Sequence, residues 1–399
     1  MSVKERLVRY VSYDTQSDET SLSVPSTAKQ LVLADALKEE CLTMGFDHVE
    51  RDEFGVVYAI LEATAPNLDS VGFISHMDTA LEMSGANIKW RQVSSYDGKD
   101  IALSPDWMMN PSMFETLNDS IGHDLIVTDG TTLLGADDKA GIAIIMQSLE
   151  EVICEKKPHG TIYIAFTPDE EIGRGVDHFD LEKFCPKYAY TVDGDRPDSI
   201  DYETFNAAKA IVSFKGNAIH PGSAKGKMVN AALLAGQFMS MMPKDMVPEK
   251  TEGYEGFYHL LEMKGECEKA SLYYLIRNHD MELFENQKQE MLHLVDIMNE
   301  KYPDSTAIVI TDQYYNLASF MKGDMSTVDL AKKAIEKTGM KSVSIPIRGG
   351  TDGAMLSAKG LICPNLGTGS YNHHSRFEYA DIEQMETLVK VVKNIIYGV

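Results

Sequence analysis

Hydrophobic and polar residues over positions 1–200 follow two alternating periods. Helical spacing of apolar residues predicts helices over residues 2–12 and 26–44, and Gly45 ends the second one. Ser26-Thr27 is expected to cap this second helix at its N-terminus. Short apolar or alternating runs predict strands at residues 47–52, 56–63, 70–75 and 161–167. Because strands and helices alternate, this region is predicted to form an α/β domain with a largely parallel sheet.

The pattern changes between residues 205 and 315. Strands and helices are predicted there in the order βαββαβ, which is the order of a self-contained α+β domain. Helix and strand alternation resumes after this region, and the chain closes on the amphipathic stretch IEQMETLVKVVKNIIYG. We therefore predict two domains, one formed by residues 1–204 with 316–399 and the other an insertion of residues 205–315.

The formal net charge of −24 narrows the choice of partners. A surface this acidic repels nucleic acid and anionic membranes, so neither is expected to bind. The five cysteines are scattered and form no CxxC pair, which favours a reducing compartment and a metal site without cysteine. The N-terminus lacks the apolar core of a signal peptide, and no apolar run is long enough to cross a membrane. The expected location is cytoplasmic.

Two adjacent glutamates, Glu170 and Glu171, follow the predicted strand at residues 161–167. Adjacent carboxylates at the end of a buried strand repel each other, so the pair needs a cation or a shared proton. One glutamate can bind a metal ion while the other takes a proton from a water molecule beside it. Taken alone, the pair can also be interpreted as a solvated acidic turn.

His76 and Asp78 follow the predicted strand at residues 70–75. A spacing of two puts both side chains on one face of an extended chain. His76 can then bind a metal through one ring nitrogen, while Asp78 accepts the other N–H and fixes the tautomer. The alternative is a histidine at a strand end beside a capping aspartate.

Three further polar clusters could contribute ligands, and the second of two aspartates in the first can face the mouth of the sheet, where ligands bind in open α/β folds. Asp137 and Asp138 precede the helix GIAIIMQSLEEV, so one can cap the helix and the other can bridge two metal ions. Asp193 lies where a buried strand meets glycine, and a turn aspartate is its alternative interpretation. His373 and His374 share a glycine-rich loop, and at most one is expected to bind a metal because adjacent side chains point different ways. Carboxylates and imidazoles without thiolates suit two zinc ions or similar metals.

Together these clusters resemble those of the two-zinc exopeptidases, a family that includes aminoacylases, glutamate-type carboxypeptidases and tripeptide aminopeptidases. The resemblance covers nearly the whole chain, and as an ordered set its motifs are highly specific. The matching stretches are VSYDTQS, VPST, SHMDT, TDGTTLLGADDKAG, FTPDEEIG, TVDG, FNAA, HPGSAKGKMVNA, IRGGTDGA and PNLGTGSYNHH.

The resemblance implies a fold and a role for each matching residue. The fold would be a zinc-exopeptidase-like three-layer α/β/α catalytic domain, with the α+β insertion as a lid that in relatives often also forms a homodimer. The implied ligands are His76 and Asp193 for one zinc ion, Glu171 and His374 for the second, and Asp137 as the bridge. Asp78 would support His76, and Glu170 would act as general base and later as acid.

The implied activity is that of a zinc-dependent aminopeptidase. Its substrate would be a small peptide, namely a tripeptide, from which it releases the N-terminal residue. A dipeptidase, carboxypeptidase or N-acyl-amino-acid hydrolase on the same scaffold is the alternative enzyme. A peptide-binding protein with a dead site is the non-enzymatic alternative. That alternative predicts the loss of Glu170 or of a ligand, and none is missing.

Four further residues are expected to act on the substrate. His220 would help to polarise the scissile carbonyl, or else is a turn histidine before proline. Arg277 and Arg348 would pair with the C-terminal carboxylate of the peptide, or else form surface salt bridges. Asn230 would donate to a carbonyl, or else is an ordinary helix residue.

The late loop departs from the family pattern. The family has a tyrosine at the position of His373, and Ser375-Arg376-Phe377 also differ from its usual run. His374 is kept as the expected ligand because it stands at the matching position. These changes are expected to bear on substrate selectivity.

Overall fold

The computed structural model describes residues 1–399, which divide into two compact units. The larger unit comprises Met1–Tyr202, Phe320–Ile345 and Thr351–Val399. The smaller unit comprises Glu203–Ser319 and the short segment Pro346–Gly350. The predicted insertion lies within the smaller unit, whereas the prediction places residues 203–204, 316–319 and 346–350 in the other domain. Sequence periodicity could not place residues 346–350, because they join the smaller unit through backbone pairing at Ile347.

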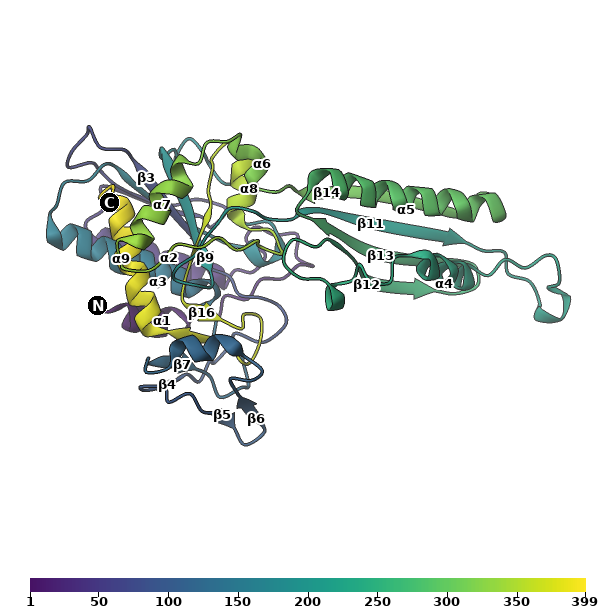
Figure 1. Ribbon diagram of the computed structural model, residues 1–399, viewed down its shortest axis with the longest axis horizontal. Coiled ribbons are helices and arrows are strands. Elements are labelled where there is room, and N and C mark those ends of the chain that lie inside the picture. Colours follow the sequence, from purple (N-terminus) through teal and green to yellow (C-terminus); the bar gives the residue numbers. More distant parts are fainter. The chain divides into compact units, whose positions relative to one another are not determined.

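A seven-stranded mixed sheet forms the centre of the larger unit (Figure 1). Its strands in spatial order are β1 (His48–Arg51), β2 (Val57–Leu61), β8 (Ile162–Thr167), β3 (Val71–His76), β9 (Tyr188–Gly194), β15 (Asn365–Gly367) and β10 (Ile200–Asp201). The inner strands β8, β3, β9 and β15 run parallel, whereas the outer pairings are antiparallel. The prediction of a largely parallel sheet is therefore right only for the inner strands. The chain reverses between β1 and β2 at Gly55, whose φ of +92° suits glycine.

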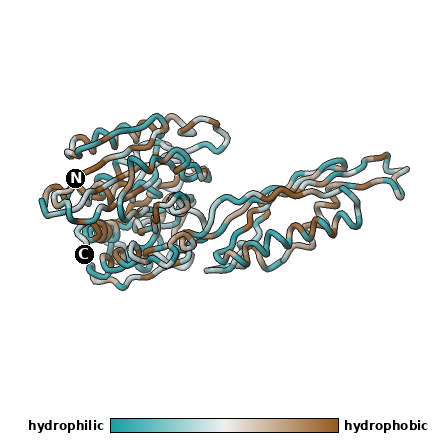
Figure 2. The backbone as a smooth tube through the Cα atoms, turned by 90° about the horizontal axis from the view of Figure 1, so that it is seen from above, coloured by the Kyte–Doolittle hydropathy of each residue, from teal (hydrophilic) through white to brown (hydrophobic).

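Helices cover both faces of this sheet, which confirms the predicted α/β/α layering (Figure 1). One face carries α1 (Val3–Tyr10), α2 (Gln30–Met44), α3 (Ala136–Glu155), α7 (Ser326–Glu336) and α9 (Ile382–Ile396). The other face carries α8 (Asp352–Ala358), where Leu356 packs with Ile74 and Phe184. A short helix, α6 (Ala318–Met321), precedes α7. Hydrophilic and hydrophobic stretches alternate along the helices, as amphipathic packing requires (Figure 2).

The predicted cap of the second helix is wrong. α2 begins at Gln30, and the side chain of its N-cap residue Lys29 makes no capping hydrogen bond. Ser26 is instead buried and binds the carboxylate of Asp169. The other end is as predicted, since the helix stops at Met44 and Gly45 follows with a φ of +89°.

A small antiparallel sheet completes the larger unit. None of its strands is predicted from the sequence. Its strands in order are β16 (Ser370–Tyr371), β17 (Tyr379–Asp381), β7 (Leu125–Val127) and β4 (Arg91–Val93). The hairpin of β5 (Ile101–Ser104) and β6 (Trp107–Met109) and the 3-10 helix η1 (Glu115–Ser120) share its core with Tyr371 and Tyr379. This sheet fixes both ends of the loop that carries His373 and His374.

The smaller unit has the predicted βαββαβ order. Its elements are β11 (Asn206–Lys215), α4 (Ala231–Met241), β12 (Phe257–Gly265), β13 (Lys269–Asn278), α5 (Met281–Lys301) and β14 (Thr306–Tyr314), with short 3-10 turns at η3 (Pro221–Ser223) and η4 (Pro248–Lys250). The strands form one antiparallel sheet in the order β12-β13-β11-β14. Both helices pack on one face of it, around a core that includes Phe214, Phe238 and Phe284.

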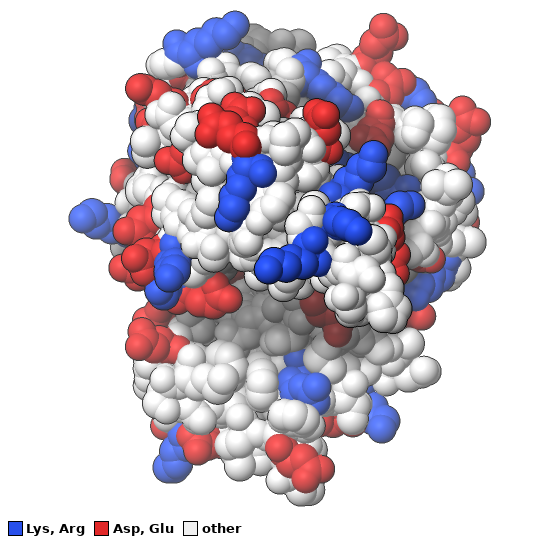
Figure 3. Space-filling view, turned by 90° about the vertical axis from the view of Figure 1, so that its right-hand side faces the viewer, with Lys and Arg blue, Asp and Glu red and all other residues white.

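The exterior carries many charges of both signs. Acidic and basic side chains are interspersed on the face seen in Figure 3. None of the helices combines the length and the hydrophobicity that crossing a membrane would require.

Candidate metal centre

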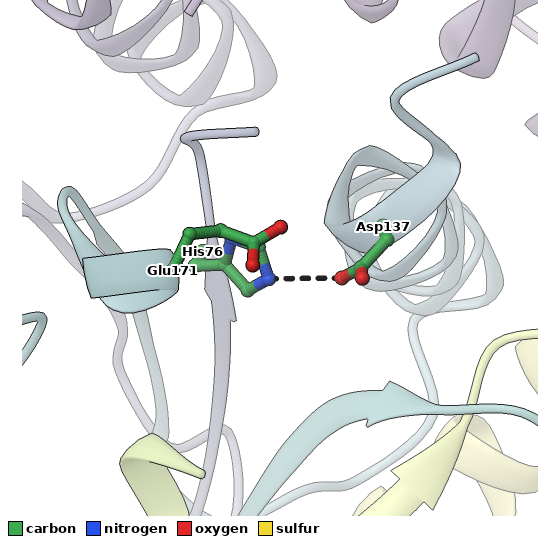
Figure 4. Close-up of side chains that lie close together, drawn as sticks. All are labelled: His76, Asp137 and Glu171. Atoms are coloured by element: carbon green, nitrogen blue, oxygen red, sulfur yellow. Dashed lines mark hydrogen bonds and ion pairs between the residues drawn. The ribbon is translucent and has the colours of Figure 1, made fainter. Parts of the chain in front are cut away.

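His76 is the last residue of β3 and lies buried among carboxylates. Its Nε2 is 3.0 Å from Oδ1 of Asp137, which stands at the start of α3 (Figure 4). The same nitrogen is 3.4 Å from Oδ1 of Asp193, near the end of β9. Since β3 and β9 are neighbouring parallel strands, their carboxyl ends bring His76 and Asp193 together.

Asp78 connects the histidine with the two glutamates. It is fully buried, and one of its oxygens lies 3.3 Å from Nδ1 of His76. Its carboxylate also accepts the backbone N–H of Glu170 at 3.0 Å and that of Glu171 at 3.2 Å. The 3-10 turn η2 (Glu170–Ile172) is thereby held beside the end of β3. Asp78 thus orients His76 and fixes the backbone from which both glutamates project.

A second group of ligand atoms lies on the other side of Asp137. Its Oδ2 is 3.3 Å from Nε2 of His374, and this nitrogen is 3.0 Å from Oε2 of Glu171. The other oxygen of Glu171 is buried and has no hydrogen-bond partner. Asp137 therefore faces His76 with one oxygen and His374 with the other. His76, Asp137 and Glu171 also have ligand atoms close enough to hold one metal ion (Figure 4).

The adjacent aspartates Asp137 and Asp138 make different contacts. Asp138 is fully buried, and its Oδ1 accepts the N–H of Gly141 at 3.2 Å, as a helix cap does. Its Oδ2 accepts the hydroxyl of Ser75 and the N–H of His76. Asp137 does not share these bonds and faces the candidate site.

The structure gives different surroundings to the two adjacent histidines. Nδ1 of His373 is 3.6 Å from Asp137 Oδ2 and 3.6 Å from Asp195 Oδ1, and its Nε2 is 2.9 Å from the hydroxyl of Ser370. Only His374 reaches Glu171 as well as Asp137. This geometry favours His374 as the ligand of the second group.

Arg376 and Phe377, which follow the two histidines and differ from the family pattern, pack beside the small sheet. The guanidinium of Arg376 stacks 3.7 Å above the ring of Trp107, and the ring of Phe377 is 5.0 Å from that of Phe114. Both contacts anchor the loop on the β5–β6 side of the unit. These two residues therefore support the position of His374 within its loop.

Burial makes the charge of these carboxylates costly. Burial raises the pKa of Glu170 well above its usual value, and it raises the pKa of Glu171 to about 7. The hydrogen bonds to Asp137 and Glu171 raise the pKa of His374 to about 12. No lysine or arginine pairs with these carboxylates. Divalent metal ions would supply the missing positive charge and a partner for the orphaned oxygen of Glu171, so the donor set fits them.

Several buried groups that support the site were not predicted from the sequence. Glu378 accepts the backbone N–H groups of Leu134, Gly135 and Asp137, at 2.6, 2.8 and 2.9 Å. Lys139 is fully buried, and burial lowers its pKa to about 8. No sequence signal marks Glu378, because its partners are backbone groups. The charged Lys139 within the apolar helix sequence could have been noticed.

The predicted substrate-binding residues lie in the smaller unit, where each has local contacts. His220 is exposed, and its Nδ1 accepts the N–H of Gly222. Asn230 caps α4. Arg277 donates to the carbonyls of Ala208 and Ile276, and Arg348 donates to Thr251, Gly253 and Glu255. Their action on a substrate stays a prediction.

Comparison with known proteins places the chain in a family. The model of peptidase family M20/M25/M40 matches residues 126–398. Peptidase T of Clostridium perfringens is 50% identical over 397 residues, covering 99% of this chain and 98% of that protein. Peptidase T of Bacillus subtilis is 46% identical over 398 residues, covering 98% and 97%.

Solved structures agree with this assignment. Aminopeptidase PepT from Bacillus cereus matches with a TM-score of 0.78 and 25% identity, covering 99% of this chain and 98% of that one. A dinuclear metal-binding peptidase of family M20 from Bacillus subtilis matches with a TM-score of 0.63 and 12% identity, covering 99% and 97%, and so shows the fold alone. The chain therefore belongs to peptidase family M20/M25/M40 and is a peptidase that resembles peptidase T over nearly its whole length.

Proposed function

We propose that the chain is a zinc-dependent aminopeptidase that releases the N-terminal residue from tripeptides. The near full-length similarity to peptidase T supports this substrate class, as do the matching structures described as an aminopeptidase and a tripeptidase. The observation that carries the proposal is the position of Asp137 between two groups of ligand atoms.

His76 and Asp193 would hold one metal ion, and Glu171 and His374 would hold the other, with Asp137 shared between them. Imidazole and carboxylate donors without thiolates suit zinc. When bound, a metal pair lowers the pKa of water and polarises a carbonyl. Zinc and the number of two ions per chain belong to the proposal.

Glu170 is the proposed general base. Its backbone is held by Asp78, and no lysine or arginine neutralises its carboxylate. The carboxylate would accept a proton from the attacking water and return it to the leaving amine of the peptide. Asp193 and Asp352 hold negative charge nearby and favour the proton on Glu170, whereas positive charge at the metal centre opposes this.

The smaller unit is proposed to act as the lid. His220 would polarise the scissile carbonyl, and Asn230 would donate to it. Arg277 and Arg348 would pair with the C-terminal carboxylate of the substrate. The homodimer and the cytoplasmic location expected from the sequence stay predictions.

Metal removal tests the proposal directly. Chelation is expected to abolish tripeptide hydrolysis, and added zinc is expected to restore it with two ions bound per chain. His374→Ala should lower the bound metal towards one ion per chain, whereas His373→Ala should leave both. Full hydrolysis by the metal-free protein would reject a metal-dependent function.

A further inference from the structure

Residues 18–30 include the motif VPST, Val24–Thr27, to which the proposed mechanism gives no role. In the structure this segment contacts the turn that carries Glu170. The contact is centred on Asp169, the residue directly before Glu170. Asp169 is 1% exposed and has a φ of +59°, a conformation that costs a non-glycine residue on the order of 1 kcal/mol.

Two buried side chains hold Asp169 in this conformation. Ser26 donates its backbone N–H and its hydroxyl to the two carboxylate oxygens, at 2.6 and 2.5 Å. The amide of Gln30 binds reciprocally, since its Nε2 donates to Asp169 Oδ1 at 2.7 Å and its Oε1 accepts the N–H of Asp169 at 3.1 Å. Both the side chain and the backbone of Asp169 are therefore fixed.

The residues after the glutamates are tied to the same segment. Arg174 donates from Nη1 to the carbonyl of Ser21 at 3.0 Å. The backbone N–H of Arg174 donates to the carbonyl of Asp169 at 3.0 Å. The N–H of Gly173 donates to the carbonyl of Glu170 at 2.7 Å. The turn is thus closed on itself and attached to residues 18–30 on both sides of Glu170.

Ser26 and Gln30 direct these bonds to Asp169 and not to the backbone at the start of α2. The N-cap residue of α2, Lys29, makes no side-chain capping hydrogen bond, and its Nζ binds Asp14 instead. Gln30 is fully buried, and apolar side chains would fill the same space without the cost of burying polar groups. A buried network of this kind fixes one geometry, and here the fixed geometry belongs to the residue beside Glu170.

We propose that Ser26, Gln30 and Asp169 are positioning residues that set the place of the Glu170 carboxylate. The proposal rests on the proposed function, in which Glu170 is the general base. Asp78 holds the N–H of Glu170 from one side, and the Ser26–Gln30–Asp169 network holds the preceding residue from the other. A general base displaced by about 1 Å can cost a reaction up to about 100-fold in rate.

Gln30→Met tests this role, because methionine keeps the volume and removes both hydrogen bonds to Asp169. Tripeptide hydrolysis by the zinc-loaded enzyme is expected to show kcat lowered about 10- to 100-fold, with KM changed less than about twofold and bound zinc unchanged. Gln147→Met is the matched control, since Gln147 accepts from Arg6 and donates to Glu151 away from the turn. Its kcat should equal that of the wild type.

The decisive arm places Gln30→Met in a Glu170→Gln background. If Gln30 acts through Glu170, the residual rate of Glu170→Gln does not fall further. A wild-type kcat in Gln30→Met alone, or an equal loss in both backgrounds, would overturn the proposal. If Gln30→Met does not fold, Ser26→Ala is judged by the same two comparisons. It removes the hydroxyl that donates to Asp169 and accepts from Asp18 and Gln30, and it keeps the backbone N–H that binds Asp169. Glu170→Gln alone tests the proposed function, so failure of the base and failure of the positioning role are distinguishable.

Discussion

At the scale of single residues, three buried carboxylates hold backbone rather than bind a cation. Asp78 accepts from Glu170 and Glu171, Glu378 accepts from the strand-to-helix turn before α3, and Asp169 accepts from Ser26. Hydrogen bonds to an ionised carboxylate are stronger than those between neutral groups, so each of these side chains restrains the segment that it binds. The candidate ligands are therefore held by their backbone as well as by their own contacts.

Glu170→Gln separates catalysis from metal binding. Glutamine keeps the shape of the side chain but cannot accept and return a proton. The variant is expected to keep its bound metal while kcat falls by about 10²- to 10⁴-fold, because general acid–base catalysis contributes about that much. Metal analysis and tripeptide hydrolysis of the same sample measure both effects. Turnover within a few-fold of the wild type would show that Glu170 is not the base.

Asp201 predicts how stability depends on pH at a distance from the metal centre. It accepts the N–H of Ile345 at 2.7 Å and the hydroxyl of Ser199 at 3.1 Å. Burial raises the pKa of this carboxyl to about 6, above the value of about 3.9 in an unfolded chain. The folded state therefore binds the proton more tightly. The protonated carboxyl of Asp201 contributes fully to the stability of the fold below about pH 4, and this contribution is lost as the pH rises through about 6.

Asp201→Asn removes this dependence. The amide oxygen can accept from Ile345, and the amide N–H can donate to Ser199. The variant is expected to be more stable than the wild type at pH 8, by on the order of 3 kcal/mol, with no difference near pH 4. Unfolding of both zinc-loaded proteins at the two pH values gives the comparison. An equal difference in stability between the two proteins at pH 4 and at pH 8 would contradict the raised pKa of Asp201.

At the scale of elements, the sequence locates the ends of long apolar strands well. β3 and β8 are apolar runs that stop at polar residues, and this pattern places His76 and the glutamates after them. The βαββαβ order is likewise predictable, because β11 has ten residues with alternating burial. β4 and β7 have three residues each, which is too few to establish a period, so the small sheet could not be predicted.

The supporting groups could not be predicted for a different reason. Glu378 and Asp169 bind backbone N–H groups, and a sequence does not show where backbone groups lie. The cap predicted at Ser26 failed for the same reason, because the hydroxyl is used by Asp169 instead. The ligand types were readable in the sequence, whereas the network that orients them required the fold.

Glu378→Gln tests the support of the α3 turn. The amide nitrogen of glutamine would face a backbone N–H of Leu134, Gly135 or Asp137, and the turn would shift. We expect metal affinity about 10- to 100-fold weaker, measured by competition with a chelating dye. Glu386→Gln, on the exposed side of α9, is the matched control and should bind metal like the wild type. Unchanged affinity in Glu378→Gln would limit Glu378 to a role in folding.

At the scale of the whole molecule, the candidate centre gathers segments from most of the larger unit. His76, Asp137, Glu171, Asp193 and His374 come from five separate places in the sequence. The parallel strands β8, β3 and β9 bring Glu171, His76 and Asp193 to one edge, while the start of α3 and the loop after β16 add Asp137 and His374. Family membership follows from the match to the family model and from the near full-length similarity. The choice of substrate within the family depends on recognising the free ends of a peptide.

The most direct test of the central claim is a matched panel of substrates given to one zinc-loaded sample. The panel contains a tripeptide, its N-acetylated form, the corresponding dipeptide and an N-acetyl amino acid. The account predicts cleavage of the free tripeptide alone, with release of its N-terminal residue. Cleavage of the N-acetylated substrates, or preference for the dipeptide, would contradict a tripeptide aminopeptidase and assign the chain to another activity of the same family.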